Sequence, residues 1–199
     1  MAKQMNWYKF EQTLKIKKIL FFTPLDVKRI FGIGSTAVSF LLYRYSRRGL
    51  ILHLKRGCYA LSSDLPNDFS LANKLYEPSY ISLEFALSFH GIIPETVYEI
   101  TSITPKSTRR FSMMGKNFSY HRIKKEAFGG YIPLKQNDAV FLIAEPEKAF
   151  VDFVYLKMLQ GQRSIDRFRK NKLNKKKVFA YARLFKNKRL IVFIKNIFS

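Results

Sequence analysis

The chain of 199 residues is long enough for one large domain or two small ones. It carries 36 Lys and Arg residues against 14 Asp and Glu residues, a formal net charge of +22, which favours a polyanionic partner such as a nucleic acid. A single cysteine excludes an internal disulfide, and no apolar run is long enough for a transmembrane helix. Because the N-terminus also lacks the pattern of a secretory signal, we expect a cytoplasmic protein without a membrane partner.

The positive charge is unevenly distributed along the chain. Residues 1–62 hold 12 basic and 2 acidic side chains, residues 63–160 hold 11 of each, and residues 161–199 hold 13 basic and 1 acidic. A general effect on solubility would not need this segregation. We therefore expect a basic N-terminal part, a neutral middle part and a basic tail, and we leave open whether the tail contacts nucleic acid.

Two helices and a sharp turn are predicted at the start of the chain. Apolar residues at a mostly helical spacing predict a first helix over residues 6–21. A second helix follows, for which Thr23 can supply the cap, Pro24 the first position, and Asp26 a negative charge near the exposed amides. The Gly-Ile-Gly sequence of residues 32–34 then ends this helix, because glycine permits the backbone angles of a tight turn.

The next helix, predicted from Ser35 to about Arg48, has the features of a DNA-recognition helix. Ser35 can cap it, and Gly49 ends it. Its apolar face has the i, i+3, i+4, i+7 spacing of a buried stripe and consists of Val38, Leu41, Leu42 and Tyr45. The opposite face combines hydroxyl groups near the N-terminus with cations near the C-terminus, which suits base edges and phosphates. This face consists of Thr36, Ser39, Phe40, Tyr43, Arg44 and Arg47.

A short hairpin completes the pattern of a winged helix-turn-helix. Residues 50–55 and 58–61 alternate as two strands, and Lys55 and Arg56 at the tip are expected to contact the sugar-phosphate backbone. Each piece alone also occurs in proteins that never bind DNA, so the prediction depends on the combination with the charge. The predicted contacts with double-stranded DNA are Ser35, Thr36, Ser39, Phe40, Tyr43, Arg44, Arg47, Lys55 and Arg56.

A linker rich in turn-forming residues, residues 62–68, separates this domain from the rest of the chain. We therefore expect a winged helix-turn-helix domain over residues 1–62 and a second domain over residues 63–199, which ends in the basic helical tail of residues 161–199. The predicted fold class is α+β, with a mixed α/β second domain that has a mainly antiparallel sheet and C-terminal helices.

Hydrophobic patterns predict the elements of the second domain. Helices are expected over residues 69–75, 82–90, 146–159, 164–170, 175–185 and 188–197, and strands over residues 80–81, 97–104, 109–113, 118–123, 131–133 and 139–144. The helix that Ser82 can cap is apolar nearly all round, so it is expected to be buried. Asn174 and Asn187 are the predicted caps of the last two helices.

No strong catalytic pattern is present, and we predict no cofactor and no metal site. His53, His90 and His121 are scattered without metal-ligand spacing. Glu145, Glu147 and Asp152 are the densest acidic cluster, where a nuclease could hold magnesium. Acidic residues in the first turn of a helix are explained more simply as partners of the helix dipole, so a metal-dependent nuclease is the weakest alternative and the protein is not expected to be an enzyme.

The middle of the chain resembles AbiEi-type antitoxins, which belong to bacterial type IV toxin–antitoxin (abortive-infection) systems. The main signature is the run from Pro78 to Glu95. Further similar segments are Val97-Tyr98, Ile100–Thr104, Lys106, Thr108-Arg109, Phe128–Tyr131, Ala144–Ala149 with Asp152, Tyr181-Ala182 and Asn187–Leu190. With the N-terminal domain, the resemblance spans nearly the whole chain.

The resemblance implies an antitoxin with two roles. The winged helix would repress the protein's own operon at inverted repeats, and the C-terminal domain would neutralise a nucleotidyltransferase-type toxin, without a need for a stable complex. The residues of the signature are mostly of the kind that packs a core, and the polar exceptions are Glu84, Lys106, Arg109 and Lys148. The alternative is a stand-alone winged-helix transcriptional regulator without a toxin partner.

Overall fold

The computed structural model describes residues 5–136, 139–162 and 167–199. The chain forms two compact units, residues 1–67 and residues 68–199, which we name the N-terminal and C-terminal units. The division between them falls at Asn67, rather than after residue 62 where the sequence pattern suggested it. None of the helices in the described residues is long and apolar enough to cross a membrane.

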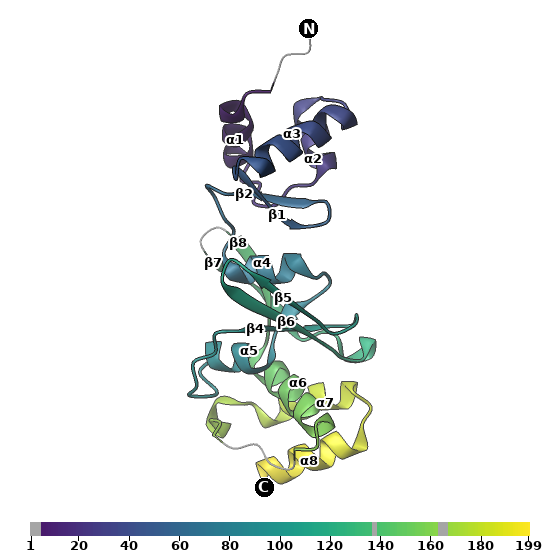
Figure 1. Ribbon diagram of the computed structural model, residues 1–199. Coiled ribbons are helices and arrows are strands. Elements are labelled where there is room, and N and C mark those ends of the chain that lie inside the picture. The colour runs from purple at the N-terminus through teal and green to yellow at the C-terminus, as the bar shows by residue number, and fades with distance from the viewer. Residues whose placement is uncertain (1–4, 137–138, 163–166) are drawn as a thin grey trace. The chain divides into compact units, whose positions relative to one another are not determined.

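The N-terminal unit is a three-helix domain with a two-stranded antiparallel hairpin (Figure 1). Its elements are α1 (Trp7–Ile16), α2 (Pro24–Phe31), α3 (Ser35–Arg47), β1 (Ile51–Lys55) and β2 (Cys58–Leu61). Helix, turn, helix and hairpin therefore follow one another as predicted. The first helix is shorter than expected, because Lys18 has a positive φ of 51° and the chain leaves the helix after Ile16.

Local signals explain both helix starts in the helix-turn-helix. Thr23 and Asp26 form a reciprocal capping box, in which the Thr23 hydroxyl accepts from the Asp26 amide at 3.2 Å and the Asp26 carboxylate accepts from the Thr23 amide at 2.8 Å. Gly32 ends α2 in the left-handed region at φ 64°. The predicted Ser35 cap is wrong, because Gly34 occupies the cap position without a side-chain bond and Ser35 is already the first helical residue.

The core of the N-terminal unit is apolar and aromatic. The predicted stripe of α3 is confirmed as buried. Phe10 is central, since its ring centroid lies 5.1 Å from that of Phe31, 5.2 Å from that of Tyr45 and 5.7 Å from that of Phe22. The buried residues of this core are Phe10, Leu14, Phe22, Val27, Val38, Leu41, Leu42, Tyr45, Ile51 and Leu61.

The C-terminal unit is built on a mixed six-stranded sheet in the order β5-β6-β4-β3-β8-β7. The strands are β3 (Tyr80–Ile81), β4 (Ile100–Thr104), β5 (Arg109–Met113), β6 (Lys116–Arg122), β7 (Tyr131–Gln136) and β8 (Ala139–Ala144). The β5–β6, β3–β4 and β7–β8 pairs are antiparallel, whereas β4–β6 and β3–β8 are parallel. The predicted α+β class with a mainly antiparallel sheet is therefore confirmed.

Helices cover both faces of this sheet. They are α4 (Asp68–Leu75), α5 (Leu83–Phe89), α6 (Pro146–Leu159), α7 (Lys175–Leu184) and α8 (Lys188–Phe198), with short 3-10 turns η1 (Lys125–Ala127) and η2 (Lys170–Lys172). In Figure 1, α4 lies on one side of the sheet and α5 and α6 on the other. The alternation of side chains along β6 agrees with this arrangement. The Tyr120 hydroxyl donates to the Ala72 carbonyl of α4 at 2.5 Å, whereas the next residue, His121, faces residues of α5 and α6.

Several predictions for the C-terminal unit need correction. Helix α5 is not buried all round, because Phe89 is 46 % exposed near its end. Ser82 occupies the cap position of α5 without capping it, since its hydroxyl donates to Asp152 instead. The strand predicted from residue 97 begins at Ile100. The helix predicted over residues 164–170 lies partly outside the described residues. In its described part, residues 167–170, the chain forms no α-helix, and the 3-10 turn η2 begins at Lys170.

The two edge strands of the sheet carry charged side chains or proline. Strand β5 presents the exposed Arg109 and Arg110. Strand β7 contains Pro133, which lacks a backbone N–H, and the exposed Lys135. Neither edge strand is therefore the long, flat, apolar kind that pairs readily with a strand of another chain.

Candidate functional site

The outer face of α3 is a continuous exposed stripe in the N-terminal unit. We name it the recognition face, and it consists of Thr36, Ser39, Phe40, Tyr43 and Arg47. Phe40 is 71 % exposed and Tyr43 is 64 % exposed, although large aromatic side chains are usually buried. The buried stripe on the other side fixes the rotation of α3, so the recognition face points to solvent.

The recognition face changes in chemical character along the helix. Near its start, the Ser39 hydroxyl donates to the Ser35 carbonyl at 3.1 Å, which leaves the lone pairs of the hydroxyl oxygen available as acceptors. Near its end, the Arg47 guanidinium lies 6.0 Å from the centroid of the Tyr43 ring, at the limit for a cation–π contact. Small hydroxyl groups, exposed rings and a cation therefore follow one another on one face.

Arg44, predicted to belong to the same face, occupies a different environment. It is half-buried, and its guanidinium lies 5.3 Å from the ring of Tyr45 in the core. It also lines a small cavity beside the start of α1, with Trp7 and Arg48. Arg44 is therefore less available to a partner than Arg47.

The hairpin between β1 and β2 places Arg56 at its tip. Arg56 is exposed, and Lys55 is half-buried. Gly57 follows with φ 71°, a conformation that allows the tight reversal between the strands. Cys58 is buried, as expected of a small apolar strand residue.

The C-terminal unit contains a fully buried group of polar side chains, which we name the polar centre: Lys148, Asp152, Tyr80 and Ser82. Lys148 and Asp152 lie one turn apart on α6, form an ion pair and are both 0 % exposed. The Asp152 carboxylate also accepts from the Tyr80 hydroxyl at 3.0 Å and from the Ser82 hydroxyl at 2.9 Å. The polar centre thus joins α6 to β3 and to the start of α5.

Burial controls the electrostatics of the polar centre. It raises the pKa of Asp152 and lowers that of Lys148, and each partner opposes the shift of the other. Burial and the charge of Asp152 also raise the pKa of the Tyr80 hydroxyl. Because no member is accessible to a ligand, we interpret this centre as a structural element.

Gly130 makes the close packing around Lys148 possible. Its φ is 70°, and a Cβ atom at this position would lie 2.5 Å from the Tyr181 ring and 3.0 Å from the Lys148 side chain. Glycine is therefore required here both for its conformation and for space.

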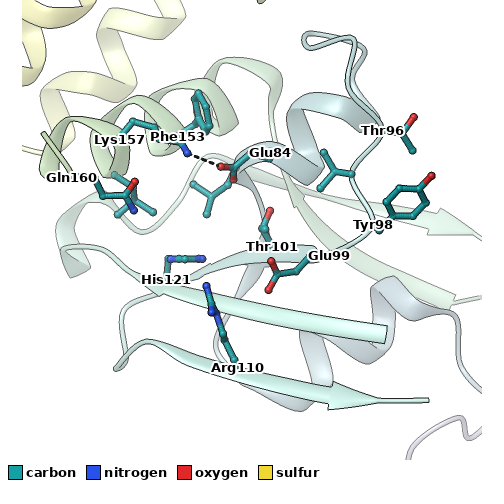
Figure 2. Close-up of a pocket in the computed structure, with 13 residues that line it drawn as sticks. Glu84, Thr96, Tyr98, Glu99, Thr101, Arg110, His121, Phe153, Lys157 and Gln160 are labelled. Atoms are coloured by element: carbon teal, nitrogen blue, oxygen red, sulfur yellow. Dashed lines mark ion pairs between the residues drawn. The ribbon is translucent and has the colours of Figure 1, made fainter. Parts of the chain in front are cut away.

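A cavity of about 570 Å³ opens on the face of the sheet that is covered by α5 and α6 (Figure 2). Thr101 on β4, Arg110 on β5 and His121 on β6 share this face, because Arg110 and Thr101 each pair with Ser119, two residues before His121. The other walls come from α5, from α6 and from the loop before β4. The lining residues are Leu83, Glu84, Thr96, Val97, Tyr98, Glu99, Thr101, Arg110, His121, Phe153, Leu156, Lys157 and Gln160.

The cavity has charged groups of both signs. Glu84 of α5 and Lys157 of α6 form an ion pair at 3.3 Å, drawn as a dashed line in Figure 2. Burial lowers the pKa of His121, whose ring is therefore neutral at pH 7. Within the described residues, the Arg110 guanidinium and the Glu99 carboxylate have neither a hydrogen-bond nor an ion-pair partner.

The four polar residues singled out in the signature run are not brought together. Glu84 lines the cavity, and Lys148 belongs to the polar centre. Lys106 is exposed and donates to the Glu77 carbonyl at 2.5 Å, and Arg109 is exposed on the edge strand β5. They therefore occupy separate places in the C-terminal unit.

Sequence reasoning missed most of the groups that surround these residues. They are Tyr80, Ser82, Glu99, Arg110, His121 and Lys157. One signal was present for the polar centre, because Lys148 and Asp152 are spaced i, i+4 in a helix that is apolar on nearly every side. No comparable signal marked the cavity, since its residues come from distant segments.

The acidic cluster considered for a nuclease is occupied by other contacts. Glu145 pairs with Lys177 at 2.9 Å, and this contact lowers the pKa of Glu145. Asp152 lies in the buried polar centre. The described part of the chain has no group of three or more His, Cys, Asp and Glu side chains that could hold a metal ion.

The exposed recognition face, the basic hairpin tip and the mixed-charge cavity are thus the features to which a function can be attached. No family model matches the chain, and the search of curated proteins finds no match.

Proposed function

We propose that this protein is a cytoplasmic DNA-binding antitoxin of a type IV toxin–antitoxin system. Its N-terminal unit would bind its own operator, at inverted repeats, and repress the operon. Its C-terminal unit would counteract a nucleotidyltransferase-type toxin without a stable complex. The antitoxin role is supported by the resemblance of the run from Pro78 to Glu95 to AbiEi-type antitoxins.

The observation that carries the DNA-binding part is the recognition face of α3. This helix exposes Phe40 and Tyr43 next to hydroxyl groups and an arginine. Exposing large aromatic rings to water does not stabilise a folded domain, so their exposure favours a binding surface. In a duplex, Thr36 and Ser39 would contact base edges in the major groove, and the rings would pack on thymine methyl groups or sugars. Arg47 and Arg56 would bind phosphates.

The charge of the chain supports the same proposal. The first 62 residues hold 12 basic and 2 acidic side chains, so the unit that carries the recognition face is itself strongly basic. Each phosphate neutralised by such a protein releases counterions, and the logarithm of affinity falls with the logarithm of salt concentration by about 0.9 per contact.

The test is the affinity of the full-length protein for the DNA upstream of its own gene, measured by fluorescence anisotropy at several salt concentrations. Arg56→Ala should weaken binding to specific and random duplexes equally and reduce the salt slope by about 1. Thr36→Ala and Ser39→Ala should instead reduce the preference for the operator. Lys9→Ala, on the exposed side of α1, is the matched control. An operator bound with no salt dependence would contradict the proposal.

The antitoxin part is tested by co-expression with the product of the adjacent gene. Full-length protein and residues 63–199 should both restore growth, and Arg47→Ala with Arg56→Ala should leave this rescue intact. Glu84→Gln, Lys106→Met and Arg109→Met are the variants expected to weaken rescue while DNA binding is kept. If the neighbouring product is not a toxin but operator binding persists, the protein is a stand-alone winged-helix regulator.

A further inference from the structure

The cavity of the C-terminal unit is balanced in charge, in contrast to the chain as a whole. The protein has a formal net charge of +22, but the cavity is lined by Glu84 and Glu99 as well as Arg110 and Lys157. A polyanion such as a nucleic acid or a nucleoside triphosphate would meet two carboxylates there. A lining with equal numbers of cations and anions favours a ligand that carries both charges.

Two of these four charges are free to bind a ligand. Glu84 of α5 and Lys157 of α6 neutralise each other in an ion pair. Arg110 and Glu99 lack such a partner within the described residues. Figure 2 shows both side chains directed into the same space beside His121.

Arg110 and Glu99 have complementary recognition chemistry. The planar guanidinium can donate two parallel hydrogen bonds to a carboxylate. The carboxylate can accept from an ammonium group. His121 lines the same space, and burial lowers the pKa of its ring, which favours the neutral form.

The remaining lining of the cavity combines apolar side chains with the polar side chains of Thr96, Thr101 and Gln160. Val97, Phe153 and Leu156 contribute aliphatic and aromatic surface, and the volume of about 570 Å³ lies within the range of about 300–1,000 Å³ that is typical of small-ligand sites. An apolar group attached to a zwitterion could therefore leave water while the charged groups are paired.

We propose that this cavity binds a free α-amino acid with an apolar side chain, with its carboxylate on Arg110, its ammonium group on Glu99 and its side chain against Phe153 and Leu156. The two residues that would bind the ligand charges, Arg110 and Glu99, are not among those to which DNA binding or the antitoxin role is attributed.

The test uses the full-length protein and each of the twenty common L-amino acids, with thermal unfolding as the screen and isothermal titration calorimetry as the measurement. At least one of leucine, isoleucine, valine, phenylalanine and methionine should raise the unfolding temperature and bind. Its N-acetyl derivative and its amide, each of which lacks one charge, should bind at least tenfold more weakly.

Variants then locate the binding site. Arg110→Ala and Glu99→Gln should each lower the affinity for that amino acid at least tenfold. Matched controls are Arg122→Ala, exposed on β6, and Glu95→Gln, exposed in the loop before β4, neither of which lines the cavity. Both controls should bind like the parent protein. Because Arg110 is exposed and Glu99 is half-buried, all four variants should fold, which circular dichroism verifies.

Three results would overturn the proposal. The first is that none of the twenty amino acids binds. The second is binding that survives both Arg110→Ala and Glu99→Gln. The third is that adenosine monophosphate or inorganic phosphate binds in an Arg110-dependent manner while amino acids do not, which would make the cavity an anion site.

Discussion

The two units of this protein place their polar groups in opposite ways. In the described residues, every buried polar or charged side chain belongs to the C-terminal unit, and the N-terminal core consists of apolar and aromatic side chains. Both units expose large aromatic side chains, which include Phe40 and Tyr43 in the N-terminal unit and Phe89 and Tyr98 in the C-terminal unit. The N-terminal unit thus has an apolar interior, whereas the largely apolar interior of the C-terminal unit also contains buried polar and charged groups.

This difference indicates which residues determine the fold of each unit. An apolar core tolerates substitutions that keep its volume. The fold of the N-terminal unit therefore depends little on its surface residues, which can instead serve to bind a partner. A buried ion pair stabilises little by itself, since desolvation offsets attraction, but it disfavours arrangements in which a charge lacks its partner. We expect the C-terminal unit to be more sensitive to single polar substitutions, and each prediction below tests this contrast.

The largest effect is expected from the polar centre. Asp152→Ala leaves the Lys148 ammonium buried without its partner, which should cost about 3–5 kcal/mol in the free energy of unfolding. Glu11→Ala removes the i, i+4 partner of Lys15 on α1 and the acceptor of the Ser63 hydroxyl, both near the surface, and should cost only about 1 kcal/mol. The single tryptophan, Trp7, reports on the N-terminal unit by fluorescence, while circular dichroism follows the whole chain.

The double variant Lys148→Met with Asp152→Leu is the control for this prediction. It removes both charges, so it should recover much of the stability lost in Asp152→Ala. If Asp152→Ala proves no more costly than Glu11→Ala in urea unfolding, the contrast between the two units fails.

A smaller effect is expected from Gly130→Ala. The new methyl group would meet the Tyr181 ring and the Lys148 stem, which should destabilise by about 1–3 kcal/mol through overpacking, in addition to the backbone strain at φ 70°. Gly115→Ala is the matched control, because Gly115 has φ 73° but nothing lies within 4 Å of the position of its Cβ. Equal unfolding midpoints for the two variants would show that the packing at Gly130 is unimportant.

The N-terminal unit should respond mainly to its local signals. Thr23→Ala breaks the capping box at the start of α2 and should cost about 1 kcal/mol, while Thr23→Ser should keep most of the stability. The change should appear in the urea transition followed by Trp7 fluorescence. A loss from Thr23→Ser as large as that from Thr23→Ala would exclude the cap as the cause.

The smallest effect concerns the pH dependence of the C-terminal unit. Burial lowers the pKa of His121 below its usual value of about 6.5, so the unfolded chain binds the proton first as the pH falls. Stability should therefore be fully present above about pH 6.5 and decline below it. His121→Asn should flatten this part of the profile of unfolding free energy against pH, and an unchanged slope would contradict the assignment.

Elements with strong local signals were predictable from the sequence. The cap at Thr23, the buried stripe of α3 and the hairpin around Arg56 all depend on residues a few positions apart. Helix α6 begins at Pro146 and ends at Leu159, as its proline and apolar pattern predicted. Residues 17–21 were placed wrongly in α1, because their apolar side chains have helical spacing although the backbone turns at Lys18.

Features that depend on distant contacts were not predictable. The parallel pairing of β4 with β6 and of β3 with β8 follows from the topology of the sheet, which the pattern of any one strand does not encode. An i, i+4 pair such as Lys148 and Asp152 has the same spacing whether it is exposed or buried. The cavity combines side chains as far apart in sequence as Glu84 and Lys157.

The edges of the six-stranded sheet have a consequence for the behaviour of the protein in a crowded cell. An open edge is a template on which a strand of another chain can be added, which is how ordered aggregates start. The proline of β7 removes one donor from such a ladder, and a second copy of β5 would bring Arg109 and Arg110 against the same cations. Both edges therefore disfavour the addition of a further strand, so the protein can accumulate to high concentration without joining edge to edge.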